Sequence, residues 1–249
     1  MRIKTILAGL LLAIGFTSSF AQKETNIPLD FTLQVKNMHL WRGQEVTSAA
    51  LGAVERSIAT KNKKFTFGLW GGAGFNGTYR EFDYYVKFQK SGFSLEVWDI
   101  YNFSKDAGHQ NDKIFNYSTR TSGRFIDIAA AYQFQGKFPL KISWATVVFG
   151  RDRGVKNEKQ LYSTYVSAEY PVLRHNIVNL DLGVAGAFAL DKESGTSKNF
   201  YGESAGIVNI SLTASKVIKI GSYKLPISVT PMWNPENNSG NIQVAINLF

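Results

Sequence analysis

The chain has 249 residues, a formal net charge of +9 and no cysteine, and its aromatic residues are Phe 18, Tyr 11 and Trp 5. The absence of cysteine excludes disulfides, thiolate metal sites and lipid attachment at a cysteine. The three histidines, His39, His109 and His175, are dispersed, so we expect no metal site and no cofactor. The basic residues are scattered along an exported chain, so we also expect no nucleic-acid partner.

Residues 1–21 have the features of a secretory signal peptide. Two basic residues precede an apolar run over 6–16, and Ser19-Phe20-Ala21 is a small-x-small cleavage site. A membrane anchor is the alternative, but the apolar run is too short to span a bilayer. We predict cleavage after Ala21, export to a bacterial envelope, and a single domain over 22–249.

The rest of the chain alternates large apolar residues with small or polar ones. In "NLDLGVAGAFAL" (179–190), Leu180, Leu182 and Val184 are separated by Asp181 and Gly183, which is the two-residue period of a strand. About twelve such segments follow in chain order, a number that fits the even count of bacterial barrels. They cover approximately 31–42, 47–59, 64–75, 79–90, 92–103, 123–135, 137–149, 160–171, 177–190, 203–216, 222–233 and 241–249. The second has the least contrast between its faces.

The connections between these segments alternate between short and long. The long ones lie at about 104–122, 150–159 and 191–202. A membrane barrel with brief periplasmic turns and longer outer loops predicts this order, whereas a soluble sandwich has no reason to sort its loops. We therefore expect an all-β, transmembrane, antiparallel up-and-down β-barrel of about 12 strands in the bacterial outer membrane. Outer-membrane lipid, lipopolysaccharide and the barrel-insertion machinery are the partners expected with it.

Several residues depart from the alternation. The first segment changes face at Met38 and Leu40. Pro226 and Pro231 fall in the eleventh segment, where we expect a bulge or an unpaired end. Asp99 falls on an apolar face, which is explained either by a bulge that turns it inward or by a place at the outer rim.

Two stretches resemble the opening of the TorF-type porin family of Gram-negative envelopes. They are "HLWRGQEVTSAAL" (His39 to Leu51) and "FTFGLWGGAGF" (Phe65 to Phe75), with Trp41, Arg42 and Gly43 and the Trp70-Gly71-Gly72 region as the motif-like positions. The family opens with an aromatic-Arg-Gly turn, a weak second strand and a Gly/Trp-rich third strand. The resemblance implies an outer-membrane barrel and a pore, and it implies no catalytic residues.

The face opposite the apolar one is expected to line the lumen, and its charges bear on function. It carries six acids, Glu81, Asp83, Glu96, Asp127, Glu169 and Asp181, and four bases, Lys36, Lys87, Lys141 and Lys224. Asp83, Glu96, Asp127, Asp181, Lys87 and Lys141 are our candidate pore-lining residues. They predict a passive channel for small solutes with a weak preference for cations. The competing interpretation is that the acids pair with Lys87 or with an arginine of a folded-in loop and brace the wall.

Two other functions remain open. His39, near the outer end of the first strand, could belong to a lipid hydrolase if a serine and a polar partner lay beside it. Alternatively, the barrel is structural or adhesive and its lumen is filled by side chains, since twelve strands fall between the filled and the open barrels. A basic group in one outer loop, Arg151, Arg153 and Lys156, is expected either near anionic lipid headgroups or simply in solvent.

Overall fold

The structure is a computed structural model and describes residues 28–105, 107 and 113–249. The signal peptide predicted at 1–21 and His109 lie outside the described residues. Within the described ranges, no helix is long and apolar enough to cross a bilayer.

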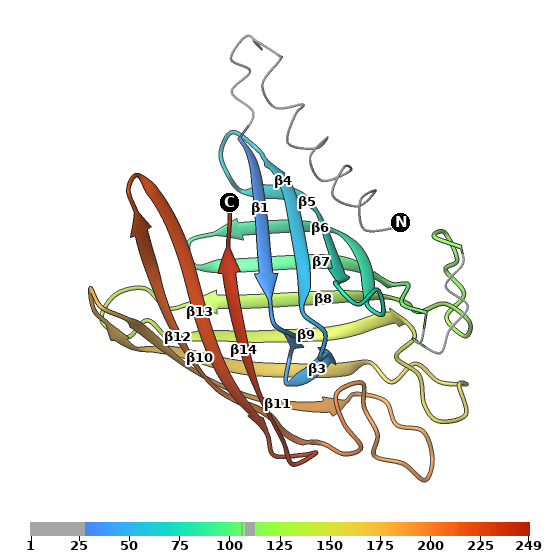
Figure 1. The fold of residues 1–249 in the computed structure, drawn as a ribbon. Coiled ribbons are helices and arrows are strands. Elements are labelled where there is room, and N and C mark those ends of the chain that lie inside the picture. Colours follow the sequence, from blue (N-terminus) through green and yellow to red (C-terminus); the bar gives the residue numbers. More distant parts are fainter. Residues whose placement is uncertain (1–27, 106, 108–112) are drawn as a thin grey trace.

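Twelve strands form a closed antiparallel barrel (Figure 1). They are β1 (Leu29–Lys36), β4 (Leu51–Ala59), β5 (Phe65–Gly74), β6 (Arg80–Lys90), β7 (Phe93–Asn102), β8 (Arg124–Gln133), β9 (Lys141–Gly150), β10 (Ser163–Arg174), β11 (Asn179–Ala189), β12 (Gly206–Ile220), β13 (Tyr223–Asn234) and β14 (Ser239–Asn247). The barrel closes because β1 pairs with both β4 and β14. The predicted barrel class and strand number are confirmed.

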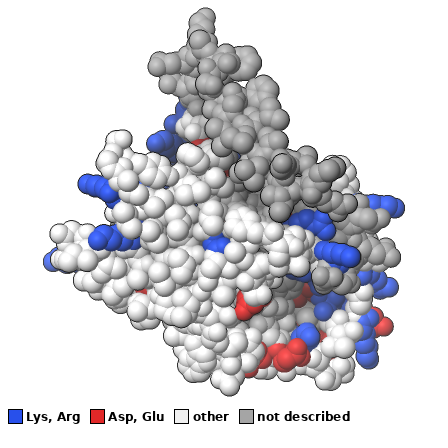
Figure 2. Space-filling view, viewed as in Figure 1, with Lys and Arg blue, Asp and Glu red and all other residues white. Residues whose placement is uncertain are grey.

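The alternation of the sequence becomes the two faces of the wall. In β11, Leu182 and Val184 are exposed on the exterior, while Ala185 and Ala187 are buried inside the barrel. Figure 2 shows that most of the wall on the viewed side carries neither basic nor acidic side chains, and that Lys and Arg gather toward its ends. The exterior is thus a largely uncharged belt, and most polar side chains of the strands point inward.

The two ends of the barrel differ in their connections. The loop end carries residues 37–50, 75–79, 103–105, 107, 113–123, 151–162, 190–205 and 235–238, whereas the turn end carries 60–64, 91–92, 134–140, 175–178 and 221–222. The start of β1 and the end of β14 also lie at the turn end (Figure 1). The long connections predicted at about 104–122, 150–159 and 191–202 therefore share one end.

The first connection corrects the predicted course of the first two strands. The chain leaves the wall after Lys36, which pairs directly with Leu51 at the start of β4. Between them, β2 (His39–Trp41) and β3 (Gln44–Thr47) form a separate two-stranded hairpin. The predicted first strand therefore ends six residues early, near the change of face at Met38. Arg42 (φ 48°) and Gly43 (φ 82°) form the turn of this hairpin.

The expected bulge or unpaired end is absent at Pro226, which pairs with Val217, whereas Pro231 interrupts the pairing. β12 and β13 keep one register on both sides of Pro231, but the two residue pairs between Ser211↔Met232 and Ala214↔Val229 are missing. Pro231 has no N–H to donate there, so the ladder has an unpaired step and no bulge. Asp99 stays on the exterior, where Arg124 donates a hydrogen bond to its carboxylate. The rim alternative for Asp99 is therefore correct, since β7 pairs with β6 and β8 without a register shift.

Candidate functional site: the luminal hairpin and the loop-end cavity

The hairpin of residues 37–50 folds into the barrel and reaches the far wall. Gln44 Nε2 donates to the carbonyl oxygen of Phe200, at 2.9 Å, and the Leu40 N–H donates to Gln243 Oε1, at 3.0 Å. Asn234 Nδ2 donates to the carbonyl oxygen of Gly43, at 2.9 Å. β14 and β13 lie beside β1 in the sheet, so these contacts join the hairpin to the near wall and to the 190–205 connection. The hairpin reaches the opposite wall through Arg42, which bonds to Asp127 of β8.

An ion pair fixes the tip of the hairpin. Arg42 makes two hydrogen bonds to Asp127 of β8, at 2.8 and 2.6 Å, and a third to the Tyr201 hydroxyl, at 2.9 Å. Burial alone would lower the pKa of Arg42, but its hydrogen bonds and its attraction to Asp127 and Tyr201 raise it, so the guanidinium stays charged. Because Asp127 is fully buried, loss of Arg42 would leave an unpaired charge inside the protein.

Aromatic packing surrounds this ion pair. Trp41 contacts three rings, with centroid distances of 6.0 Å to Phe125, 6.1 Å to Phe200 and 5.8 Å to Tyr201. Trp41 and Phe200 pack on two clusters of buried residues, Ile100, Phe125 and Val147 on one side and Tyr165, Ala185, Ala187, Tyr201 and Val208 on the other. The hydrophobic core of this barrel therefore lies inside its loop-end half.

Gly43 allows the hairpin to approach β12 closely. A Cβ atom at this position would lie 2.1 Å from the carbonyl oxygen of Val208, and the φ of +82° is one that side chains rarely adopt. Both constraints select glycine.

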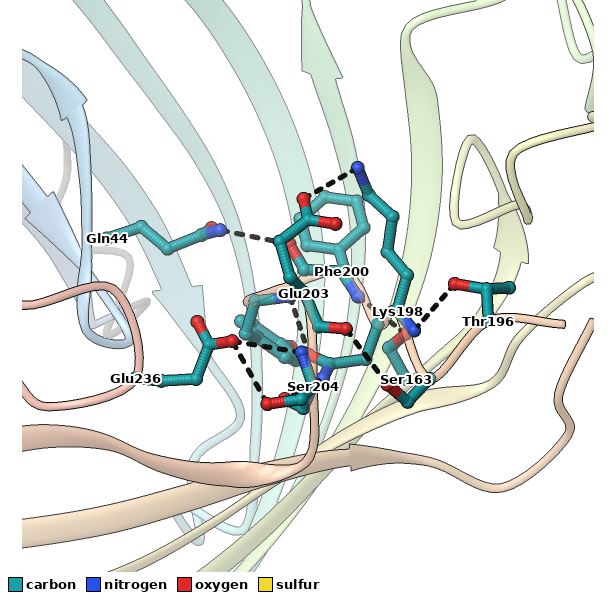
Figure 3. A network of polar contacts seen from close by, with 11 residues as sticks. Gln44, Ser163, Thr196, Lys198, Phe200, Glu203, Ser204 and Glu236 are labelled. Carbon is teal, nitrogen blue, oxygen red and sulfur yellow. Dashed lines mark hydrogen bonds and ion pairs between the residues drawn. The ribbon is translucent and has the colours of Figure 1, made fainter.

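The 190–205 connection completes the inner packing (Figure 3). The Phe200 N–H donates to Ser163 Oγ of β10, at 2.7 Å, which turns the Phe200 backbone toward the wall. The Ser204 N–H donates to Glu236 Oε1, at 2.9 Å, and Lys198 forms an ion pair with Glu203, also at 2.9 Å. These contacts place Phe200 and Tyr201 under the hairpin.

The turn-end half of the lumen is different, because its charges are paired but still exposed. Lys87 and Glu96 lie 3.0 Å apart with side chains 33% and 25% exposed, and Lys141 and Glu169 lie 3.3 Å apart with 40% and 50% exposed. Arg174 and Asp181 form a third pair.

These contacts place the candidate pore-lining residues. Glu96, Lys87, Lys141 and Asp181 lie in the pairs of the turn-end half, and Asp127 is held by the folded-in Arg42. Asp83 is buried and accepts a hydrogen bond from the Tyr101 N–H, at 3.0 Å. The observed partners, Lys87 and a loop arginine, are those named by the bracing interpretation. The expected preference for cations stays a prediction.

A cavity of about 720 Å³ lies between the hairpin and the wall formed by β5 to β8. Its lining includes six aromatic side chains, Trp41, Trp70, Tyr79, Trp98, Phe125 and Phe200. Arg151 also lines it and lies over the rings of Phe125 and Phe200, 5.1 and 5.2 Å from their centroids. Arg151 therefore faces the interior, and its expected place near lipid headgroups is wrong.

His39 lies in β2, which is not a strand of the barrel, and it lines the same cavity. Its ring lies between Trp70 and Tyr79, with centroids 5.7 and 5.8 Å away, and burial together with the charge of Lys36 lowers its pKa to about 3. Its Nδ1 has no hydrogen-bond partner among the described residues. The serine and polar partner that a hydrolase would need do not bond to it there.

Metal ligation gains no support within the described ranges, because no group of three or more His, Cys, Asp or Glu is arranged to hold an ion.

Comparisons with known proteins give few relatives. No family model matches the sequence, and no curated protein matches it. A solved structure titled "Asymmetric conductivity of engineered proteins" is similar with a TM-score of 0.37 and 10% sequence identity. The match covers 79% of this chain and 54% of that one, so this chain spans about half of its length.

Proposed function

We propose that the protein is an outer-membrane channel for small solutes, narrowed at its loop end by the hairpin of residues 37–50. The observation that carries this proposal is the set of partly exposed ion pairs inside the turn-end half of a closed barrel. Charged side chains that stay exposed inside a barrel need water around them, because burying them in a dry interior is costly. A water-filled half lumen is a vestibule that solutes can enter.

The exterior supports a place in a membrane. Large apolar side chains such as Phe67 of β5, Trp144 of β9 and Leu182 of β11 are exposed on the outside of the barrel, where a soluble protein would present polar ones. The proposal puts this surface in contact with outer-membrane lipid and lipopolysaccharide. It also assumes export by the predicted signal peptide and assembly by the barrel-insertion machinery.

The second candidate is a structural barrel with a closed lumen. The buried Arg42–Asp127 pair and the rings around Trp41 favour it, because together they fill much of the loop-end half. The proposal includes no enzymatic activity, since His39 is held between aromatic rings without a partner at Nδ1 among the described residues.

Planar-bilayer recording of the refolded chain 22–249 separates the two candidates. A channel gives discrete conductance steps that persist at low voltage. Barrels that are shown to be folded and inserted but carry no current would support the structural candidate and end the channel proposal. Lipid turnover by the same preparation, abolished by His39→Ala, would instead establish an enzyme.

A further inference from the structure

We propose that the loop-end cavity is a binding site for an uncharged saccharide of one or two sugar units. This inference rests on the proposed function, because it names the class of solute that would meet the channel at its loop end. The volume of about 720 Å³ is within the range of pockets that hold small molecules. The walls and the free polar atoms point to this class, and the balance of charge is compatible with it.

The cavity is lined by aromatic side chains that a sugar ring can contact. Three indole rings, those of Trp41, Trp70 and Trp98, face one cavity, and flat aromatic faces accept the C–H groups of a sugar ring through weak contacts. Trp98 is held in place, because its ring stacks on Tyr85 with centroids 4.2 Å apart and its Nε1 donates to Glu96, at 2.9 Å. A ring that is fixed in advance loses little conformational entropy when a ligand stacks on it.

Two residues of the cavity lining have buried polar atoms without a hydrogen-bond partner among the described residues. His39 is about nine-tenths buried and its Nδ1 has no partner among the described residues, and the buried Nε of Arg151 has none there either. Buried polar atoms are nearly always bonded, and both residues line the cavity, so these two atoms call for a partner that the described residues do not supply. Asp83 and Asn102 add a buried carboxylate and a buried amide to the same lining. Sugar hydroxyls donate and accept, so one polyol can satisfy donors and acceptors together.

The charged side chains of the cavity lining are of both signs. Four acids and three bases line the cavity, and one of each is committed to the Arg42–Asp127 pair. The remaining acids are Glu45, Glu81 and Asp83, and the remaining bases are Lys36 and Arg151. A cation would lie near the two bases, and an anion would lie near the three acids. An uncharged ligand is repelled neither by the two bases nor by the three acids, so a neutral sugar is compatible with this mixed lining, and the choline comparison below tests the small excess of acids.

Isothermal titration calorimetry of the refolded chain in detergent tests the site, with maltose as the probe and choline chloride and sodium sulfate as ionic comparisons. We expect saturable binding of maltose and none of the two salts. Binding of choline in place of maltose would identify a cation site and overturn the inference. Absence of maltose binding would overturn it as well.

Two lining variants and one control make the test specific. Trp70→Leu removes an aromatic wall and Arg151→Gln removes an unpaired donor while keeping a side chain of similar length, so each should weaken maltose binding at least tenfold. Trp144→Leu is the matched control, because this indole is exposed on the exterior wall and should leave binding unchanged. Folding of each variant is checked by its heat-dependent shift on gels. Equal binding by the parent and a folded Arg151→Gln variant would contradict the assignment even if Trp70→Leu failed to fold.

Different results of these experiments refute the binding site and the channel. Maltose binding in detergent without conductance in bilayers would sink the channel and leave the site. Conductance without maltose binding would sink the site and leave the channel.

Discussion

The two halves of the lumen differ in how far their ion pairs are buried. In the loop-end half, the ion pair of Arg42 and Asp127 has side chains only 16% and 1% exposed, and aromatic rings close around it. In the turn-end half, the pairs on the same inner face remain one quarter to one half exposed. The wall is the same barrel throughout, so the difference comes from two connections, 37–50 and 190–205, that fold inward at one end only.

This contrast shows that one sheet can enclose both a packed half and a half whose ion pairs stay partly exposed. In this barrel of twelve strands, Trp41 and Phe200 from the connections 37–50 and 190–205 pack on the buried wall residues of the loop-end half. The inward loops give the loop end a packed core and a defined cavity, and leave the ion pairs of the turn end partly exposed. Four experiments test whether the two halves differ in this way, and they follow in decreasing order of expected effect.

Cysteine labelling should show the largest difference. The chain has no cysteine, so single substitutions are the only reactive sites. Ser143→Cys lies on the inner face near the turn end and should react readily with a small water-soluble maleimide, whereas Ala187→Cys is buried under Tyr201 and should be nearly inert. Similar rates at both positions would mean that the two halves do not differ in water access.

Removing one partner of the buried ion pair should have the second-largest effect. Arg42→Ala leaves Asp127 buried and unpaired, which should cost about 3–5 kcal/mol in the docking of the hairpin. Faster hydrogen exchange at 38–47 is the readout. Glu169→Gln is the matched control, because an exposed pair contributes about 1 kcal/mol or less. Equal effects from the two variants would contradict the contrast between the halves.

Replacement of Gly43 by alanine should weaken hairpin docking less than loss of Arg42, and Gly77 provides a matched control. Gly43→Ala places a methyl group against the carbonyl of Val208 in a backbone conformation with positive φ, so we expect a loss of about 1–3 kcal/mol in hairpin docking. Gly77→Ala shares the positive φ but meets nothing within 4 Å, so it should disturb only its own turn. Hydrogen exchange at 38–47 should change in the first variant and not in the second.

Acidification should give the smallest effect. Burial holds the pKa of His39 near 3, below its ordinary 6.5, so the docked hairpin keeps this ring neutral. Docking is therefore undisturbed above pH 6.5 and weakens as the pH falls below it, by at most about tenfold per pH unit. The protection factor of the amides at 38–47, which is the intrinsic exchange rate divided by the observed rate at each pH, should fall between pH 7 and pH 5.5 in the parent and less in His39→Phe. An unchanged protection factor in the parent would show that the ring is solvated.

The sequence predicts the wall better than its interior for a physical reason. Exterior residues such as Leu182 and Trp144 alternate with inner ones over short distances, so a local period reveals each strand. The hairpin depends on partners far away in the chain: Arg42 contacts residues 127 and 201, and Gly43 approaches residue 208. No local period encodes those contacts.

Local signals of the hairpin were nevertheless present in the sequence. Strand one changes face at Met38 and Leu40, and the Arg42-Gly43 pair suits a turn with positive φ. Phe200 and Tyr201 gave no comparable signal, because they lie in a loop and acquire their role only from the rings they meet across the lumen.

The most direct test of a hairpin-narrowed channel is the single-channel conductance of the barrel without that hairpin. Because Lys36 and Leu51 are direct partners in the sheet, a tight glycine- and asparagine-containing turn can replace residues 37–50 without moving β1 or β4. Recorded in the same bilayer and salt as the parent, this variant should show a conductance several times larger. A folded, inserted variant with the same conductance as the parent would contradict the central claim that residues 37–50 narrow the pore.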